Sequence, residues 1–246
     1  MITQVRFSSS VKFFEQDFCA RWNVRTYYDQ SASCLFAGVY STEDVRVINA
    51  HKGFKVVWNN GHVRPFFTQL NPKNMVVLKY TDSIDHSILG NKYKMKRARF
   101  EIKDYSLFKP SPLGDCVCCY LGTPALSKLY GRDEVTKLMK KVKYSVLISY
   151  LGMTRTQLKE QIYDRCFVYF KPIMVGGVET ANELALMGRQ TISNAKGEYY
   201  IPYTSIDHAC ELIEKEAVDI GKTRNSVLPS DYFDTGKEWM DENFWL

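Results

Sequence analysis

The feature that most constrains the fold is a repeated alternation: a short run of apolar, β-branched residues, then a turn, then a segment of helical character. The first clear case is SCLFAGVY (33–40), followed by STED (41–44), in which Ser41 or Thr42 can cap a helix and the two acidic residues suit its first turn. Two similar runs follow, FKVVWNNG (54–61) and NMVVLKY (74–80). Strands that alternate with helices predict an α/β fold with parallel sheets.

The alternation restarts after KPSPLGD (109–115), a stretch with two prolines and a glycine that is typical of a linker. Three strand-like runs lie beyond it, separated by helix-like segments: CVCCYLG, YSVLISYLG and FVYFKPI. We therefore expect two α/β domains of similar size, at 1–109 and 110–224. The first 32 residues show no clear pattern, and we expect them to be irregular or to add one strand.

Composition narrows the class of protein. The chain has 246 residues, of which 45% are hydrophobic and 24% charged, a balance that can build and cover a core. No apolar run approaches the ~20 residues of a membrane-spanning helix, and the N-terminus does not resemble a secretory signal. We expect a soluble, cytoplasmic protein without a membrane partner. The net charge of +6 mildly favours an anionic partner, either a nucleotide or a nucleic acid.

The stretch GGVETANELALMGRQTI (176–192) is the strongest candidate for a binding site. Gly176 and Gly177 follow a strand and precede a helix that we expect to begin near Glu179 or Thr180, and such a turn attracts phosphate. Glu183 lies one helical turn after Glu179, so this face of the helix could accept hydrogen bonds from the vicinal hydroxyls of a ribose. Alternatively, Glu179 complements the helix dipole and Glu183 is a solvated surface charge.

The run ELALMGRQTI (183–192) resembles the E-A-x-x-x-G-x-P-x-I segment of GT-B-fold glycosyltransferases, with Gln190 where many members have proline. Further stretches resemble small phage-encoded glycosyltransferases, including relatives of those that modify 5-hydroxymethylcytosine in phage DNA: FAGVYSTED, HKGFKVVWNNGH, PLGDCVCCYLG and LYGRDEV. The resemblance covers most of the chain between residues 33 and 221.

The resemblance implies two Rossmann-like domains facing across a cleft, with the acceptor bound by the first and the nucleotide-sugar donor by the second. Residues 225–246 would form a C-terminal helix that packs back on the first domain. Glu183 would bind the ribose, Gly176 and Gly177 would hold the diphosphate, and Glu179 and Thr180 would touch the sugar or phosphate. The donor would be a UDP-sugar, and no other cofactor is implied. No D-x-D pair is present, so we expect no metal ion.

Other candidate residues follow from their place at strand ends. Gly122 and Thr123 end the first strand after the linker and would face the donor. Lys143 or Arg155 could neutralise the charge that grows on the leaving diphosphate, although Lys143 also suits an ordinary surface role. For the catalytic base that an inverting enzyme needs, we favour His62, in the turn NNGH, and then Asp82.

The segment KYKMKRAR (92–99) carries five basic residues that could contact DNA phosphates: Lys92, Lys94, Lys96, Arg97 and Arg99. Alternatively, it is an edge strand whose charges prevent aggregation. The function expected overall is transfer of a sugar to 5-hydroxymethylcytosine in DNA. The alternatives are transfer to a glycan, a lipid carrier or an already glycosylated base, and a non-catalytic nucleic-acid-binding module.

Overall fold

The structure is a computed structural model that describes residues 2–59, 65–79, 92–173, 176–195, 197–233 and 242. The chain divides into two compact units. Unit 1 comprises Met1–Tyr105 and Ser230–Leu246, and unit 2 comprises Ser106–Pro229. Each unit has its own sheet and its own core.

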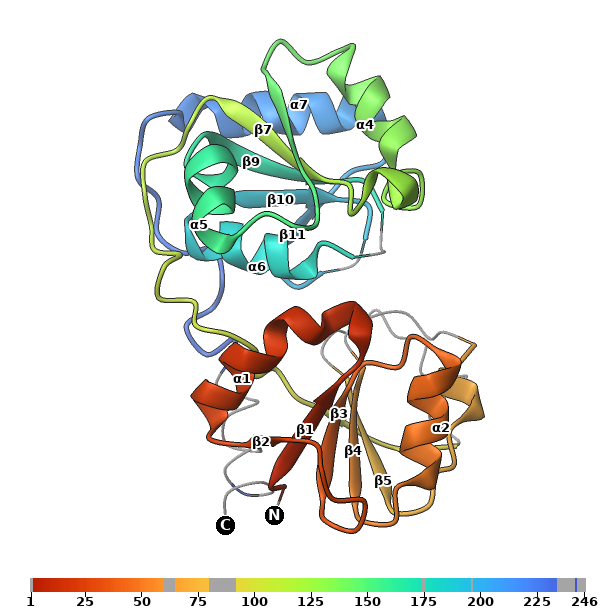
Figure 1. Ribbon diagram of the computed structural model, residues 1–246. Helices are drawn as coiled ribbons and strands as arrows, with labels where there is room; N and C mark the ends of the chain where they lie inside the picture. The colour runs from red at the N-terminus through yellow and green to blue at the C-terminus, as the bar shows by residue number, and fades with distance from the viewer. Residues whose placement is uncertain are drawn as a thin grey trace. The chain divides into compact units, whose positions relative to one another are not determined.

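The sheet of unit 1 contains six parallel strands in the order β2-β1-β3-β4-β5-β6. The strands are β1 (Gln4–Phe7), β2 (Arg25–Thr26), β3 (Cys34–Ala37), β4 (Lys55–Asn59), β5 (Met75–Lys79) and β6 (Lys94–Arg97). The described helical segments are the 3-10 helices η1 (Ser9–Phe14) and η2 (Phe67–Gln69) and the helices α1 (Glu15–Trp22) and α2 (Thr42–Ala50). Figure 1 shows α1 and α2 on opposite sides of the strands.

The start of α2 is a capping box. The Ser41 hydroxyl accepts from the Asp44 amide, and the Asp44 carboxylate accepts from the Ser41 amide at 2.9 Å. The same carboxylate oxygen also accepts from the Ser8 hydroxyl at 2.7 Å, which joins the end of β1 to the start of α2. Asp44, which the sequence marks only as a charge at a helix start, is therefore a buried structural acceptor.

The first 32 residues correct the expectation for this region. They supply β1, which lies inside the sheet between β2 and β3, as well as a complete α-helix. β1 is buried although it contains Gln4, because the Gln4 side-chain oxygen accepts from the amides of Tyr28 and Asp29 at 3.1 and 3.0 Å. Burial of a polar side chain is tolerated when its hydrogen bonds are made.

The sheet of unit 2 contains five parallel strands in the order β11-β10-β9-β7-β8. The strands are β7 (Cys116–Tyr120), β8 (Val146–Ser149), β9 (Cys166–Lys171), β10 (Gln190–Ser193) and β11 (Tyr200–Pro202). The α-helices are α4 (Arg132–Met139), α5 (Arg155–Leu158), α6 (Val178–Leu186) and α7 (Ile206–Glu216). The helix α5 continues directly as the π-helix η4 (Lys159–Tyr163). Two short 3-10 helices are η3 (Pro124–Leu126) and η5 (Ala217–Asp219). In Figure 1, α4 and α7 cover one face of the sheet, and α5 and α6 cover the other.

A buried arginine fixes the beginning of unit 2 to its sheet. The guanidinium of Arg189 donates to the carbonyls of Cys166, Ser111 and Pro112 at 3.1, 3.0 and 2.7 Å. The side chain is fully buried, so these hydrogen bonds replace water completely. The segment whose composition is typical of a linker is thus held firmly where it enters unit 2.

The expectation of an α/β chain with parallel sheets is confirmed. The expected C-terminal helix, 225–246, is not present over 225–233, which form turns and irregular chain, and of the rest only residue 242 is described. Two described residues of that segment contact the first part of unit 1: Tyr232 lies under the Arg99 guanidinium, 4.5 Å from its ring centroid, and Phe233 stacks on Tyr105 at 4.8 Å. Among the described helices, none is long and apolar enough to span a bilayer.

Candidate functional site

The candidate site lies at the carboxyl edge of the unit 2 sheet. In chain order, the five strands have the arrangement 2-1-3-4-5, so the direction of winding reverses between β7 and β9. In doubly wound sheets, ligands bind at this reversal, beyond the carboxyl ends of the two strands. The loops that leave β7 and β9 carry Gly122 and the pair Gly176-Gly177, all three of them candidates from the sequence.

Tyr130 brings these two loops together. A Cβ atom on Gly122 would lie 2.6 Å from the Tyr130 ring, and one on Gly176 would lie 2.1 Å from the same ring. Both glycines have positive φ, 65° and 63°, a backbone region that side chains rarely adopt. Two independent reasons, conformation and contact, therefore require glycine at both positions. Tyr130 itself was not among the residues expected from the sequence.

The turn after β9 leads directly into the start of α6. Gly177 has φ 67° and is the N-cap of the helix, which begins at Val178. A Cβ atom on Gly177 would lie 2.5 Å from the Tyr169 hydroxyl, so the backbone passes directly over β9 here. The amides of the first helical turn have no partner within the helix, which makes this end of α6 a place for an anion. Thr123, after Gly122, is the N-cap of η3 on the neighbouring loop.

Glu183 is a buried residue of α6. It is 3% exposed, and its Oε2 accepts from the Tyr163 hydroxyl at 2.7 Å. The hydroxyl of Thr180 in turn hydrogen-bonds to Tyr163, so three side chains form one buried chain. Burial and the Glu183 charge raise the pKa of Tyr163 well above its ordinary value. Glu183 is thus not a solvated surface charge.

The π-helical segment η4 explains the Tyr163 contact. A π-helical turn shifts the register of the side chains that follow it and is common at functional sites. Here it ends at Tyr163, which is fully buried against α6. A search for helical periodicity assumes 3.6 residues per turn, so it could not predict that Tyr163 contacts Glu183.

Arg155 and Glu179 lie beside this buried chain. Burial lowers the pKa of Arg155 below its ordinary value, and the carboxylates of Glu183 and Glu179 oppose that effect. Arg155 follows β8, so it lies at the same edge of the sheet as the glycine loops, and its guanidinium interacts electrostatically with both carboxylates. Glu179 is partly exposed, in the first turn of α6. The structure therefore brings together Gly122, Thr123, Arg155, Gly176, Gly177, Glu179, Thr180 and Glu183.

Lys171 is a second residue of this edge that was not expected from the sequence. It is the last residue of β9, it is 4% exposed, and the carbonyl of Ile173 accepts a hydrogen bond from its Nζ. A Cβ atom on Gly177 would lie 3.8 Å from its Cε, so the end of this side chain lies close to the turn into α6. Burial lowers its pKa to about 8. The available signal was a single charged residue at the end of the apolar run FVYF.

Lys143 does not belong to this site. It precedes β8, and since all five strands are parallel it lies at the amino edge, opposite the glycine loops. Its Nζ pairs with Glu214 of α7 at 2.9 Å, and the side chain is well exposed. Its ion pair with Glu214 and its place at the amino edge of the sheet both indicate an ordinary surface role for Lys143.

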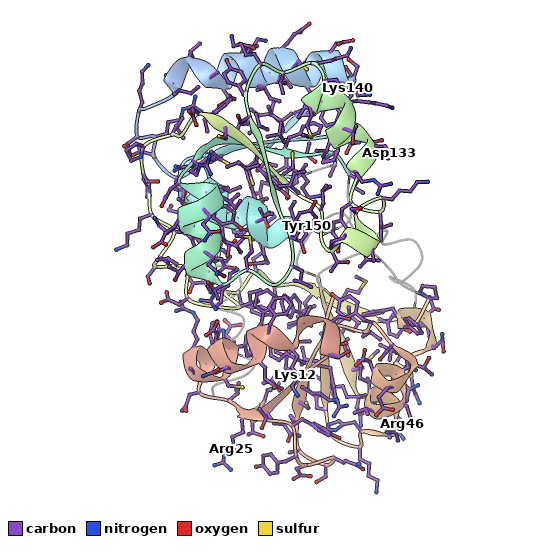
Figure 2. The ribbon with its side chains drawn as sticks, turned by 45° about the horizontal axis from the view of Figure 1, so that its top comes forward. Lys12, Arg25, Arg46, Asp133, Lys140 and Tyr150 are labelled. Carbon is purple, nitrogen blue, oxygen red and sulfur yellow. The ribbon has the colours of Figure 1, made fainter. Side chains whose placement is uncertain are left out.

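Apolar side chains flank the loop after β7. The Leu151 amide donates to the Gly122 carbonyl at 2.7 Å, which joins the loops after β8 and β7. Leu151 is 53% exposed, and its neighbour Tyr150, labelled in Figure 2, is 36% exposed. Leu126 and Leu129, in the loop after β7, are similarly exposed. An aromatic ligand such as a nucleobase would find apolar contacts beside Gly122.

The expected catalytic residues, His62 and Asp82, lie outside the described residues. In the basic segment, Lys92 and Lys94 are exposed. Among the described strands, β6 lies at the edge of the unit 1 sheet, next to β5. Arg99 corrects the expectation, because it is 7% exposed and packs over Tyr232. Lys96 is half-buried, and the side chain of Arg97 lies outside the described part of the chain.

Within the described residues, no group of three or more histidine, cysteine or acidic side chains is arranged to hold a metal ion.

No family model matches the chain, and no curated protein matches it. Among solved structures, the chain is similar to the "Transcriptional Activator of comK gene from Bacillus halodurans", with 10% identity and a TM-score of 0.28, over 100% of this chain and 99% of that one. A likeness this weak carries no functional argument.

Proposed function

We propose that the chain is a glycosyltransferase that moves a sugar from a nucleotide-sugar donor, a UDP-sugar, to a hydroxyl group, with unit 2 as the donor domain. One observation carries the proposal: two positive-φ glycine loops converge on Tyr130 where the strand order reverses, directly before α6. In such folds this position holds the phosphates of a nucleotide. The sequence resemblance to GT-B-fold enzymes supports the sugar-nucleotide class and the two-domain arrangement.

The described residues suggest separate roles. The turn Gly176-Gly177 and the start of α6 would meet the diphosphate, and Arg155 would neutralise charge as the glycosidic bond breaks. Glu179, the more exposed carboxylate, is better placed than Glu183 to accept from ribose or sugar hydroxyls. Glu183 would act indirectly, because it holds Tyr163 and lies near Arg155.

The acceptor that we propose is 5-hydroxymethylcytosine in DNA, with His62 or Asp82 as the base and the exposed Lys92 and Lys94 as phosphate contacts. A glycan, a lipid carrier or an already glycosylated base are alternative acceptors for the same donor site. The competing function is a non-catalytic nucleic-acid-binding module, which the exposure of Lys92 and Lys94 favours.

The direct test incubates the protein with a panel of UDP-sugars and DNA with or without 5-hydroxymethylcytosine, followed by nucleoside mass spectrometry. A hexose or pentose mass on the modified base alone would support the whole proposal. Binding of a UDP-sugar without transfer would retain the donor site and move the search to other acceptors. DNA binding without any UDP-sugar binding would favour the competing function.

Glycine variants test whether the turn itself binds the donor. In Gly176→Ala the new Cβ would collide with Tyr130, so we expect donor affinity to fall at least tenfold. Gly221→Ala is the matched control, because Gly221 also has positive φ, 82°, but a Cβ there meets no atom within 4 Å. Equal donor affinity in the two variants would contradict the role of the turn.

A further inference from the structure

Lys171 is a buried cation without an anion in the described part of unit 2. Its side chain is 4% exposed, and among the described residues no carboxylate lies within ion-pair distance of its Nζ. Burial is the cause that lowers its pKa, with no acidic neighbour to oppose it. Buried charges in proteins are normally paired or hydrogen-bonded, because desolvation of an isolated charge is costly.

The hydrogen bonds of the ammonium group are also incomplete. An ammonium has three N–H donors, and among the described residues only the Ile173 carbonyl accepts one of them. The two neighbours nearest to a Cβ atom on Gly177 are aromatic: Tyr169, through its hydroxyl, and Tyr120 of β7. As far as the described residues show, two donors are therefore available to a further acceptor.

The position of Lys171 coincides with the anion-attracting end of α6. Its Cε would lie 3.8 Å from a Cβ atom on Gly177, the N-cap of that nine-residue helix. The free amides at the start of a helix and a buried lysine close to its N-cap make a phosphate the best-matched ligand, since charge-assisted hydrogen bonds to it are strong.

We propose that Lys171 binds a phosphate group of the ligand at the turn between β9 and α6. This inference rests on the proposed function in so far as that phosphate belongs to a nucleotide-sugar, and it adds Lys171 to Arg155 as a cation for the diphosphate. The bond from Nζ to the Ile173 carbonyl orients the ammonium group, and phosphate oxygens accept from the remaining donors.

The test uses calorimetric binding of three probes to the full chain: UDP, inorganic pyrophosphate and uridine. In Lys171→Met we expect affinity for UDP and pyrophosphate to fall at least tenfold, with uridine affinity unchanged. Lys140→Met, at the exposed end of α4 (Figure 2), is the control and should match the wild type. Methionine has similar length and needs no charge partner, so the Lys171 variant should fold, which circular dichroism checks.

The outcomes separate the two proposals. Loss of pyrophosphate binding in Lys171→Met supports the inference even if no UDP-sugar is ever turned over, in which case only the proposed function fails. Wild-type affinity of the variant for both UDP and pyrophosphate would overturn the role of Lys171 while leaving the donor site intact. A wild-type chain that binds neither probe would overturn both.

Discussion

Lys171→Met should make the protein more stable while it weakens phosphate binding. Burial lowers the pKa of Lys171 from its ordinary 10.5 to about 8. Each unit of pKa corresponds to ~1.4 kcal/mol, so burial of the ammonium costs about 3 kcal/mol of folding free energy at pH 7. Methionine at this position avoids that cost, and we expect the variant to gain stability by about this amount.

The pH dependence of the gain follows from linkage. Because the folded chain has the lower pKa, it binds fewer protons than the unfolded chain between about pH 8 and pH 10.5, and wild-type stability rises with pH across that range. The advantage of the variant should therefore shrink from about 3 kcal/mol at pH 7 to about 1.4 kcal/mol at pH 9.5. Other groups titrate in this range, but they are common to both proteins and cancel in the difference.

The assay is urea unfolding at the two pH values. All four tryptophans lie in the segments assigned to unit 1, so tryptophan fluorescence follows unit 1, whereas circular dichroism follows both units. Because Lys171 lies in unit 2, we expect the higher stability of Lys171→Met to appear in the circular dichroism transition and not in the tryptophan fluorescence. A variant that is less stable than the wild type at pH 7, or a difference that does not change with pH, would refute the reasoning.

Three further predictions concern buried polar groups. Arg189→Met leaves several buried carbonyls without donors, and we expect urea unfolding to show a loss of ~3–5 kcal/mol, whereas a loss below about 1 kcal/mol would contradict the anchoring role. Asp44→Ala removes the acceptor of a capping box and of Ser8, and a loss of ~2–3 kcal/mol is expected in the tryptophan-detected transition, with an unchanged midpoint as the contrary result. Burial lowers the pKa of His51, so wild-type stability should fall as pH drops below about 6.5, and His51→Phe should lack that part of the slope; parallel curves for the two proteins would exclude it.

The sheet architecture was predictable because β3, β4, β5, β7, β8 and β9 are apolar runs bounded by turn residues, and Ser41 and Thr154 are good helix caps. β1 was not predictable from the pattern, because QVRF carries two polar residues. Gln4 is buried only through hydrogen bonds to a loop more than twenty residues away. Long-range hydrogen bonds of this kind leave no periodicity in the sequence.

The candidate site was predictable where conformation dictates the residue. Gly122, Gly176 and Gly177 have positive φ, and glycine is the residue that such turns favour. The burial of Glu183 and Lys171 could not be predicted, because a charged residue in a sequence is expected to be solvated unless its partner is known. In the case of Glu183, the partner Tyr163 comes from a different helix twenty residues earlier.

The discontinuity of unit 1 affects how the chain can fold during synthesis. Residues 106–229, the whole of unit 2, are synthesised before Tyr232 and Phe233. Arg99 and Tyr105 must then wait for aromatic partners encoded more than a hundred residues downstream. The unit whose synthesis begins first is therefore completed last, because its contacts with Tyr232 and Phe233 can form only after all of unit 2 has been translated.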